Sequence, residues 1–210
     1  MKKSPILPVV LLVVLAAIIV ARYAQRTHSV RLDLKPEQAL GEVTAEETDK
    51  LLNHRGQILL ITEEAADPLL EAQIEAFQTA LKKTATLNLA AVERLKPLDP
   101  LLRTMNPGGP PYLPEELLEA VKKHPQADAV VSFVGLPIGK TAELEAWKQK
   151  GGKVVAIFNT SATRPINGAM ERHLVDLAIV AREEAPAPDA SPPRSARALF
   201  DRYYLVLRPR

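Results

Sequence analysis

The sequence predicts an α/β protein: an N-terminal transmembrane helix, then one doubly wound, mainly parallel sheet of five or six strands with helices on both faces. Three observations lead to this class. Sixteen consecutive apolar residues stand at positions 6–21. From 57 to 182, short apolar runs alternate with segments of helical periodicity. These short runs are apolar throughout, as expected for strands that helices cover on both faces of a parallel sheet.

The apolar run at 6–21 has the composition of a membrane anchor. As a helix it covers roughly 24 Å, against about 30 Å for the hydrocarbon core of a bilayer. Basic residues bracket it on both sides and can extend to the interface: Lys2, Lys3, Arg22 and Arg26. We therefore expect residues 1–28 to form a single-pass anchor with its flanks, and the bilayer to be its partner.

Cleavage of this segment as a signal peptide fits the sequence less well. A cleavage site needs two small residues in an A-x-A arrangement. Ala21 and Ala24 are three positions apart, and Arg22 lies where a small residue is needed. We expect the anchor to be retained. Flanking charges do not decide its orientation, but the short N-terminal tail favours a cytoplasmic N-terminus and a periplasmic, or otherwise extracytoplasmic, large domain.

The elements of the large domain follow from apolar runs and helix-start signals. A lead-in at 29–56 holds a strand at 30–34 and a helix opened by the capping box Thr44-x-x-Glu47. A Rossmann-like α/β domain follows at 57–182. Its expected strands lie at 57–62, 87–92, 129–134, 153–159 and 174–181. Its expected helices begin at Asp67-Pro68, near Pro114, at Thr141 and near residue 166.

The end of the chain has a different composition. Residues 183–195 hold four prolines and no aliphatic side chain larger than alanine, which predicts a mobile, extended linker. The tail at 196–210 carries three of the nine aromatic residues, Phe200, Tyr203 and Tyr204. Such a tail is expected to dock, either onto this domain as a last strand or onto a partner.

A glycine-rich segment, Gly135-Leu-Pro-Ile-Gly139-Lys140-Thr141, has some features of a phosphate-binding loop. That loop needs four residues between its glycines, because its length sets which backbone N–H groups converge on the phosphate. Only three residues stand here, and proline removes one donor. The segment is therefore interpreted as a tight turn in which Thr141 caps the next helix.

Polar residues follow two of the expected strands. Because parallel strands place their carboxyl ends at one edge, these residues are candidates for ligand binding. They are Glu63 and Asp67 after the first strand, and Asn159, Thr160, Ser161 and Arg164 after the fourth. Ordinary turn chemistry is the alternative for the second group, and Asp67 is first of all a helix cap.

Neither a metal site nor a catalytic constellation is evident. The four histidines are scattered without metal-ligand spacing, no Ser sits in a G-x-S-x-G elbow, and Cys is absent. Absence of Cys also excludes disulfides and a lipid-modified cysteine anchor. A formal charge of +2 gives no nucleic-acid signature. We expect no cofactor, and an enzymatic role is the less favoured interpretation.

From 57 to 182 the chain resembles one lobe of a type 1 periplasmic sugar-binding protein. The pattern is a strand, then DPLLEAQIEAFQTALKK, a second strand, ELLEAVKKHPQADAVVSFVGLP and ELEAWKQKGGKVVAIFNTS. The resemblance implies that solute borders the loop after the first strand, the loop holding Gly135 and Pro137, and residues 159–161. Members of that family trap solute between two lobes, whereas this chain has length for one.

Two functional hypotheses follow. The first is a membrane-anchored, extracytoplasmic, non-catalytic accessory or scaffolding subunit of a membrane protein complex. It acts by contact with a membrane protein or with a second copy of itself, and residues 200, 203 and 204 are its expected docking side chains. The second is a one-lobe domain that binds or senses a small solute, a sugar or an anion, at the candidate edge.

Overall fold

The structure, a computed structural model, describes residues 33–64, 67–84, 86–99, 101, 112–136, 148, 151–158, 163–184 and 193–209. Residues from Leu34 onward form one compact unit. The expected anchor at 6–21 lies outside the described ranges. Within them, no helix is long and apolar enough to cross a membrane.

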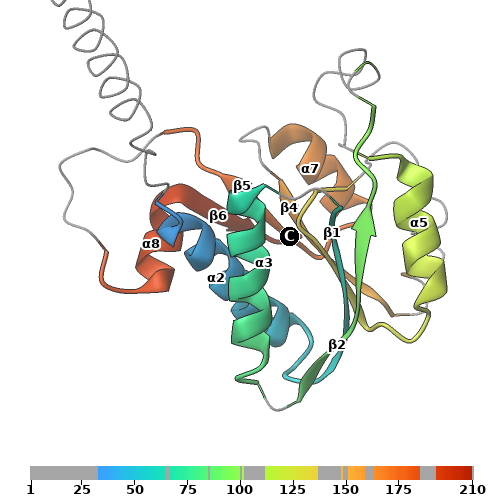
Figure 1. Cartoon of the computed structure of the whole chain (residues 1–210), viewed down its shortest axis with the longest axis horizontal. Helices are drawn as coiled ribbons and strands as arrows, with labels where there is room; N and C mark the ends of the chain where they lie inside the picture. The colour runs from blue at the N-terminus through green and yellow to red at the C-terminus, as the bar shows by residue number, and fades with distance from the viewer. Residues whose placement is uncertain are drawn as a thin grey trace, which may run out of the picture. The chain divides into compact units, whose positions relative to one another are not determined.

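A single six-stranded sheet forms the centre of the compact unit (Figure 1), with strands in the order β2-β1-β3-β4-β5-β6. The strands are β1 (Gly56–Glu63), β2 (Leu87–Leu95), β3 (Ala129–Ser132), β4 (Lys153–Phe158), β5 (Leu177–Ala181) and β6 (Tyr204–Leu207). Strands β1 to β5 pair with one another in parallel, and β6 runs antiparallel to β5. The predicted α/β class with a mainly parallel sheet is confirmed.

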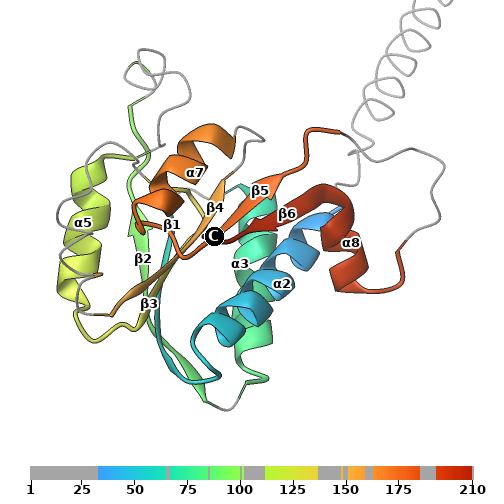
Figure 2. The same cartoon turned by 180° about the vertical axis from the view of Figure 1, so that it is seen from behind.

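Helices cover both faces of this sheet (Figures 1 and 2). On one face lie α2 (Lys35–Leu51), α3 (Pro68–Leu81) and α8 (Ala196–Tyr203); on the other lie α5 (Pro114–Lys123) and α7 (Thr163–Glu171). Successive residues of β1 alternate between the two cores: Ile58 and Leu60 enter the first, and Leu59 and Ile61 the second. All four are fully buried. A strand of uninterrupted apolar residues is therefore explained by helices on both sides of it.

The predicted capping box is wrong. Helix α2 begins at Lys35, with a proline in its first turn and Glu37 following it. Thr44 and Glu47 lie inside the helix and are buried. The Thr44 hydroxyl donates to the carbonyl of Leu40 (2.7 Å), one turn earlier, and so cannot cap a new helix. Asp33 and Leu34, the described part of the expected strand at 30–34, are not in a strand.

Two elements start at other residues than expected. Helix α7 was expected near residue 166 and β5 at residue 174. The helix spans Thr163–Glu171, and His173, two residues after its end, has a left-handed backbone (φ 56°). The N–H of Leu174 returns to the carbonyl of Ala169 (2.9 Å), which is the bond of a Schellman motif. Leu174 is therefore buried as the apolar residue closing that motif, and strand pairing starts only at Leu177.

The C-terminal tail docks on its own domain. After the linker, Ser195 caps α8 by accepting from the N–H of Ala198 (3.1 Å). Residues 204–207 then add a sixth strand at the β5 edge, which is the first of the two expected outcomes. Phe200 is fully buried in the core beneath α2 and α3 and is not accessible to a partner in this arrangement. Tyr203 and Tyr204 are half-buried.

Candidate functional site

The strand order reverses between β1 and β3. From β1 the chain passes through α3 to β2 on one side, whereas from β3 it continues to β4 on the other. The connections therefore diverge at the carboxyl ends of β1 and β3, which is where open α/β sheets bind ligands. The two ends are directly adjacent: Ile61 pairs with Ser132, and the N–H of Phe133 donates to the carbonyl of Ile61 (3.0 Å).

Two of the expected site residues lie at this edge. Glu63 is the last residue of β1, half-buried, and pairs with Leu95 at the end of β2. Gly135 lies in the turn after β3 with a left-handed φ of 75°. A Cβ atom on Gly135 would lie 3.4 Å from the Phe158 ring at the end of β4. The ends of four neighbouring strands thus meet along one edge.

Asp67 serves as the N-cap of α3. Its Oδ1 accepts hydrogen bonds from the N–H groups of Leu69 and Leu70, both at 2.9 Å. A proline occupies the first helical position, and Asp67 itself has an extended backbone (φ −76°, ψ 168°). Its side chain is exposed. One carboxylate oxygen is therefore committed to the helix, as the sequence pattern predicted.

The remaining candidates are placed only in part. Arg164 lies exposed in the first turn of α7, which follows β4. Pro137, Asn159, Thr160 and Ser161 lie outside the described residues. The structure therefore describes two parts of the expected edge: the end of β1 and the turn after β3.

A buried polar contact beneath the turn after β3 was not expected from the sequence. The hydroxyl of Tyr112 donates to the carbonyl of Gly135 (3.0 Å), and the hydroxyl of Ser132 donates to the same oxygen (2.6 Å). Both side chains are fully buried. One signal was present: a tyrosine within a Pro/Gly-rich segment must find a partner for its hydroxyl if its ring is buried.

Burial keeps the Tyr112 hydroxyl protonated. Desolvation raises the pKa of Tyr112 far above its ordinary value of 10, although the neighbouring Ser132 hydroxyl opposes the rise. The phenol is therefore protonated at neutral pH and acts as the donor. Its partner, the Gly135 carbonyl, has two lone pairs and accepts both hydroxyls.

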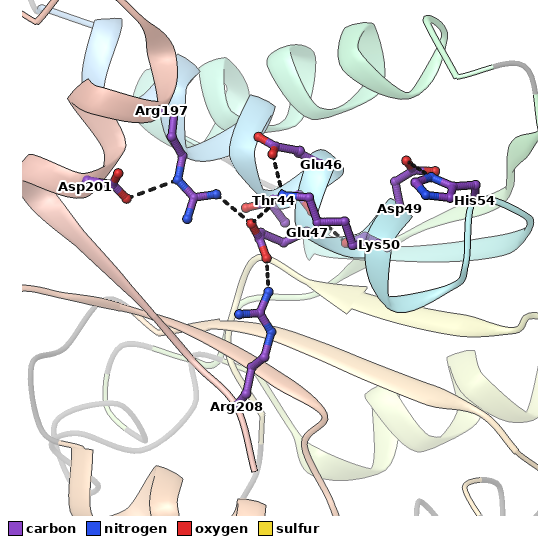
Figure 3. Close-up of polar contacts among 10 residues, drawn as sticks. Thr44, Glu46, Glu47, Asp49, Lys50, His54, Arg197, Asp201 and Arg208 are labelled. Carbon is purple, nitrogen blue, oxygen red and sulfur yellow. Dashed lines mark hydrogen bonds and ion pairs between the residues drawn. The ribbon is translucent and has the colours of Figure 1, made fainter. Parts of the chain in front are cut away.

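A second polar cluster surrounds Glu47, away from the sheet edge. Figure 3 shows its carboxylate between Arg197 of α8 and Arg208, which follows β6. Lys50, from the next turn of α2, also reaches it (3.3 Å). Glu47 is only 2% exposed, and Arg197 approaches to 2.6 Å. Because the arginines lie about 150 residues away in sequence, no local pattern could reveal the cluster.

Charges around Glu47 determine its ionisation. Burial alone would raise the pKa of Glu47. Hydrogen bonds from Arg197 and Lys50, together with the positive charges of Lys50 and Arg208, outweigh burial and hold the pKa below its ordinary value of 4.5. The carboxylate is charged at neutral pH and its neighbours are charged, so the cluster attaches the C-terminal segment to α2.

A third cluster lies at the amino ends of the strands, opposite the candidate edge. Asp176 accepts from the N–H of Val154 (2.8 Å) and pairs with Lys148 and Lys153. It therefore holds the start of β4 beside the start of β5, which is a structural role. Among the described residues, no three His, Asp or Glu side chains are placed to hold a metal ion.

Comparison with known proteins adds information at the level of the fold. No protein-family model matches the sequence, and no curated protein matches it. Solved structures do match. An arabinose-binding protein from Geobacillus stearothermophilus superposes with a TM-score of 0.56 at 15% identity, covering 82% of this chain and 61% of that one.

Two further structures show the same relationship. A sugar-binding protein of a sugar ABC transporter from Bacillus halodurans gives a TM-score of 0.52 at 12% identity and covers 69% of this chain and 45% of that one. An ABC transporter solute-binding protein from Burkholderia graminis, in complex with D-arabinose, gives a TM-score of 0.51 at 17% identity. This match covers 69% of this chain and 46% of that one.

These matches confirm the resemblance noted from the sequence as a resemblance of fold. The class that the fold defines is a single α/β lobe like those of periplasmic sugar-binding proteins. The chain spans about half the length of several of the structures it matches. Identities of 11–17% between this chain and those proteins do not carry a shared ligand over to it.

Proposed function

We propose that this chain is a single-lobe solute-binding domain, held outside the cytoplasm by an anchor at residues 6–21. The observation that carries the proposal is the adjacency of the β1 and β3 carboxyl ends at the strand-order reversal. Glu63 ends the first of these strands, and the turn after the second is held by two buried hydroxyls. Sites of this kind combine a rigid base with a few placed polar groups.

The proposed solute is small, uncharged and rich in hydroxyl groups. Three carboxylates follow one another at the end of β1: Glu63, Glu64 and Asp67. Carboxylates accept hydrogen bonds from hydroxyls and repel anions, so their presence favours a sugar over an anionic solute. The solved structures of similar fold include proteins that bind arabinose and D-arabinose, which supports the same choice.

A thermal-shift experiment on the full chain in detergent tests this proposal. D-arabinose, D-galactose and D-fructose are added separately, with inorganic phosphate as the anionic comparison. A sugar at about 100 times its Kd adds about 2.7 kcal/mol of stability, which raises Tm by roughly 5–10 °C in a domain of this size. Phosphate is expected to leave Tm unchanged. Unchanged melting with all three sugars would contradict the proposal.

Matched variants locate the site. Glu63→Gln and Arg164→Ala are expected to reduce the sugar-induced shift. Asp67→Asn keeps a good helix cap, so any change in its response reports on the charge. Glu171→Gln removes an exposed carboxylate at the other end of α7 and should respond like the wild type. Equal shifts in every variant would place the solute elsewhere.

An accessory or scaffolding role is the second candidate. It is favoured by the described fold, since a single lobe leaves a bound solute exposed where two-lobe proteins enclose it. A membrane protein, or a second copy of the chain, would then cover the candidate edge. Co-purification with a larger assembly after gentle detergent extraction is the expected result, and recovery only as a free monomer would contradict this role.

A further inference from the structure

We infer that Tyr112 and Ser132 are positioning residues for the candidate edge: they orient the peptide group between Gly135 and Leu136, and so the N–H donor that it offers to a solute. This inference rests on the proposed function for the role of that donor. Its geometric basis is the pair of hydroxyl donors that converge on the Gly135 carbonyl, at 3.0 Å and 2.6 Å.

The orientation follows from peptide geometry. The Gly135–Leu136 peptide bond is trans, and in a trans peptide the C=O and the following N–H point in opposite directions. The carbonyl points at two buried hydroxyls that enter from the α5 side of the sheet. The N–H of Leu136 therefore points away from them, out of that core.

Neighbouring groups hold this peptide in place. Gly135 adopts a left-handed φ of 75°, which a residue with a Cβ atom reaches only with strain. The side chain of Leu136 is 7% exposed and packs in the core that contains Tyr112. The N–H of Phe133 is bonded to β1. These contacts fix the turn as a whole, and the two hydroxyls fix the direction of the Gly135 carbonyl within it.

Tyr112 also joins two loops of the same edge. It precedes α5, whose first turn is close to the end of β2, because Glu116 accepts from the N–H of Lys96 (3.2 Å). Its hydroxyl then reaches across to the turn after β3. The residue that precedes α5 and the turn after β3 are thereby joined through one buried hydrogen bond.

The sequence provides a direct probe of this peptide. Gly135-Leu136 is the only Gly-Leu dipeptide in the chain. Labelling glycine carbonyl carbons with 13C and leucine nitrogens with 15N therefore gives a single carbonyl–amide correlation in an NMR spectrum of the full chain in detergent. That signal reports the hydrogen bonding of the Gly135 carbonyl and the environment of the Leu136 N–H.

Tyr112→Phe and Ser132→Ala should each move this correlation, with the carbonyl carbon shifting upfield as it loses a donor. Tyr204→Phe is the matched control, since it removes a tyrosine hydroxyl that bonds Glu37 (3.1 Å) in the opposite core. The control should leave the signal in place. In addition, D-arabinose should move the Leu136 amide in the wild type, and Tyr112→Phe should weaken its binding about tenfold, the equivalent of one lost hydrogen bond.

The outcomes separate this inference from the proposed function. If the variants move the correlation but none of the three sugars moves it or raises Tm, the proposed function is contradicted while the positioning role stands. If D-arabinose raises Tm but the correlation is the same in Tyr112→Phe, Ser132→Ala and the wild type, the positioning role is overturned. A loss of Tm alone, equal in Tyr112→Phe and Tyr204→Phe with sugar binding unchanged, would also overturn it.

Discussion

Arg197 in α8 donates to the buried carboxylate of Glu47 in α2 at 2.6 Å, although 150 residues separate them in the sequence. Arg208, beyond β6, binds the second oxygen of the same carboxylate. A single side chain of the first described helix therefore holds both ends of the C-terminal segment. This contact, together with the β5–β6 pairing, is why the tail completes its own sheet.

Removing that carboxylate should destabilise the fold. Glu47→Ala removes the acidic partner of Arg208 and leaves Arg197 with Asp201 (3.2 Å), and both arginines are partly exposed (56% and 43%) and recover some hydration. We expect a loss of about 2–3 kcal/mol in the free energy of unfolding. Glu46→Ala is the control, since that residue is 48% exposed and forms an exposed ion pair with Lys50; it should cost at most about 0.5 kcal/mol. Chemical denaturation followed by circular dichroism measures both, and equal losses would contradict a special role for Glu47.

Stability should depend on pH through the same residue. The pKa of Glu47 is held below its ordinary 4.5 in the folded state, so folding favours the charged form. Its contribution is complete above pH 4.5 and is lost as pH falls through the lowered folded-state pKa. The stability difference between the wild type and Glu47→Gln should therefore be constant from pH 7 to 5 and narrow below. If this stability difference widened on acidification, the pKa of Glu47 would be raised by folding and not lowered, which would contradict the prediction.

A glycine in α2 is expected to tolerate no side chain. A Cβ atom on Gly41 would lie 2.1 Å from the backbone oxygen of Gln73 and 2.9 Å from the N atom of Phe77, so α2 and α3 would have to separate. Gly41→Ala should cost roughly 1–3 kcal/mol, despite alanine's better helix propensity.

The control for this substitution is Gly168 in α7, where a Cβ atom would meet nothing within 4 Å. Gly168→Ala should leave stability unchanged or raise it by up to about 1 kcal/mol. The two helical Gly→Ala changes thus have opposite expected signs. Thermal unfolding of both variants in parallel checks this, and a stabilised Gly41→Ala variant would contradict the close α2–α3 packing.

The aromatic residues of the tail should differ in their roles. Phe200 is fully buried, so Phe200→Ala should cost about 3–5 kcal/mol of stability. Tyr203 is half-buried, and Tyr203→Ala should cost about 1 kcal/mol. Co-purification from detergent extracts adds a second measurement. Loss of a bound partner in Tyr203→Ala at nearly unchanged stability would support partner docking through Tyr203; no change in either measurement would contradict it.

Much of the fold could be predicted from the sequence because it depends on local patterns. Continuous apolar runs such as 57–62 and 153–159 identified buried parallel strands, and Asp67-Pro68 identified the start of α3. Local patterns also misled where two structures share one signature. Thr44-x-x-Glu47 satisfies the capping-box rule, but these residues lie within a continuous helix whose start is set by an earlier proline.

Contacts between distant segments were decided by the tertiary structure alone. The attachment of the tail depends on ion pairs between Glu47 and arginines about 150 residues away. The turn after β3 depends on a hydrogen bond between Gly135 and Tyr112, which α5 and β3 separate in the sequence. Buried polar groups must find partners, yet a sequence does not state which partner the fold brings near. The sequence therefore determined the class of fold and predicted the edge at which a solute would bind. The structure decided which side chains hold that edge and how the chain ends, because both depend on packing between elements that no local periodicity encodes.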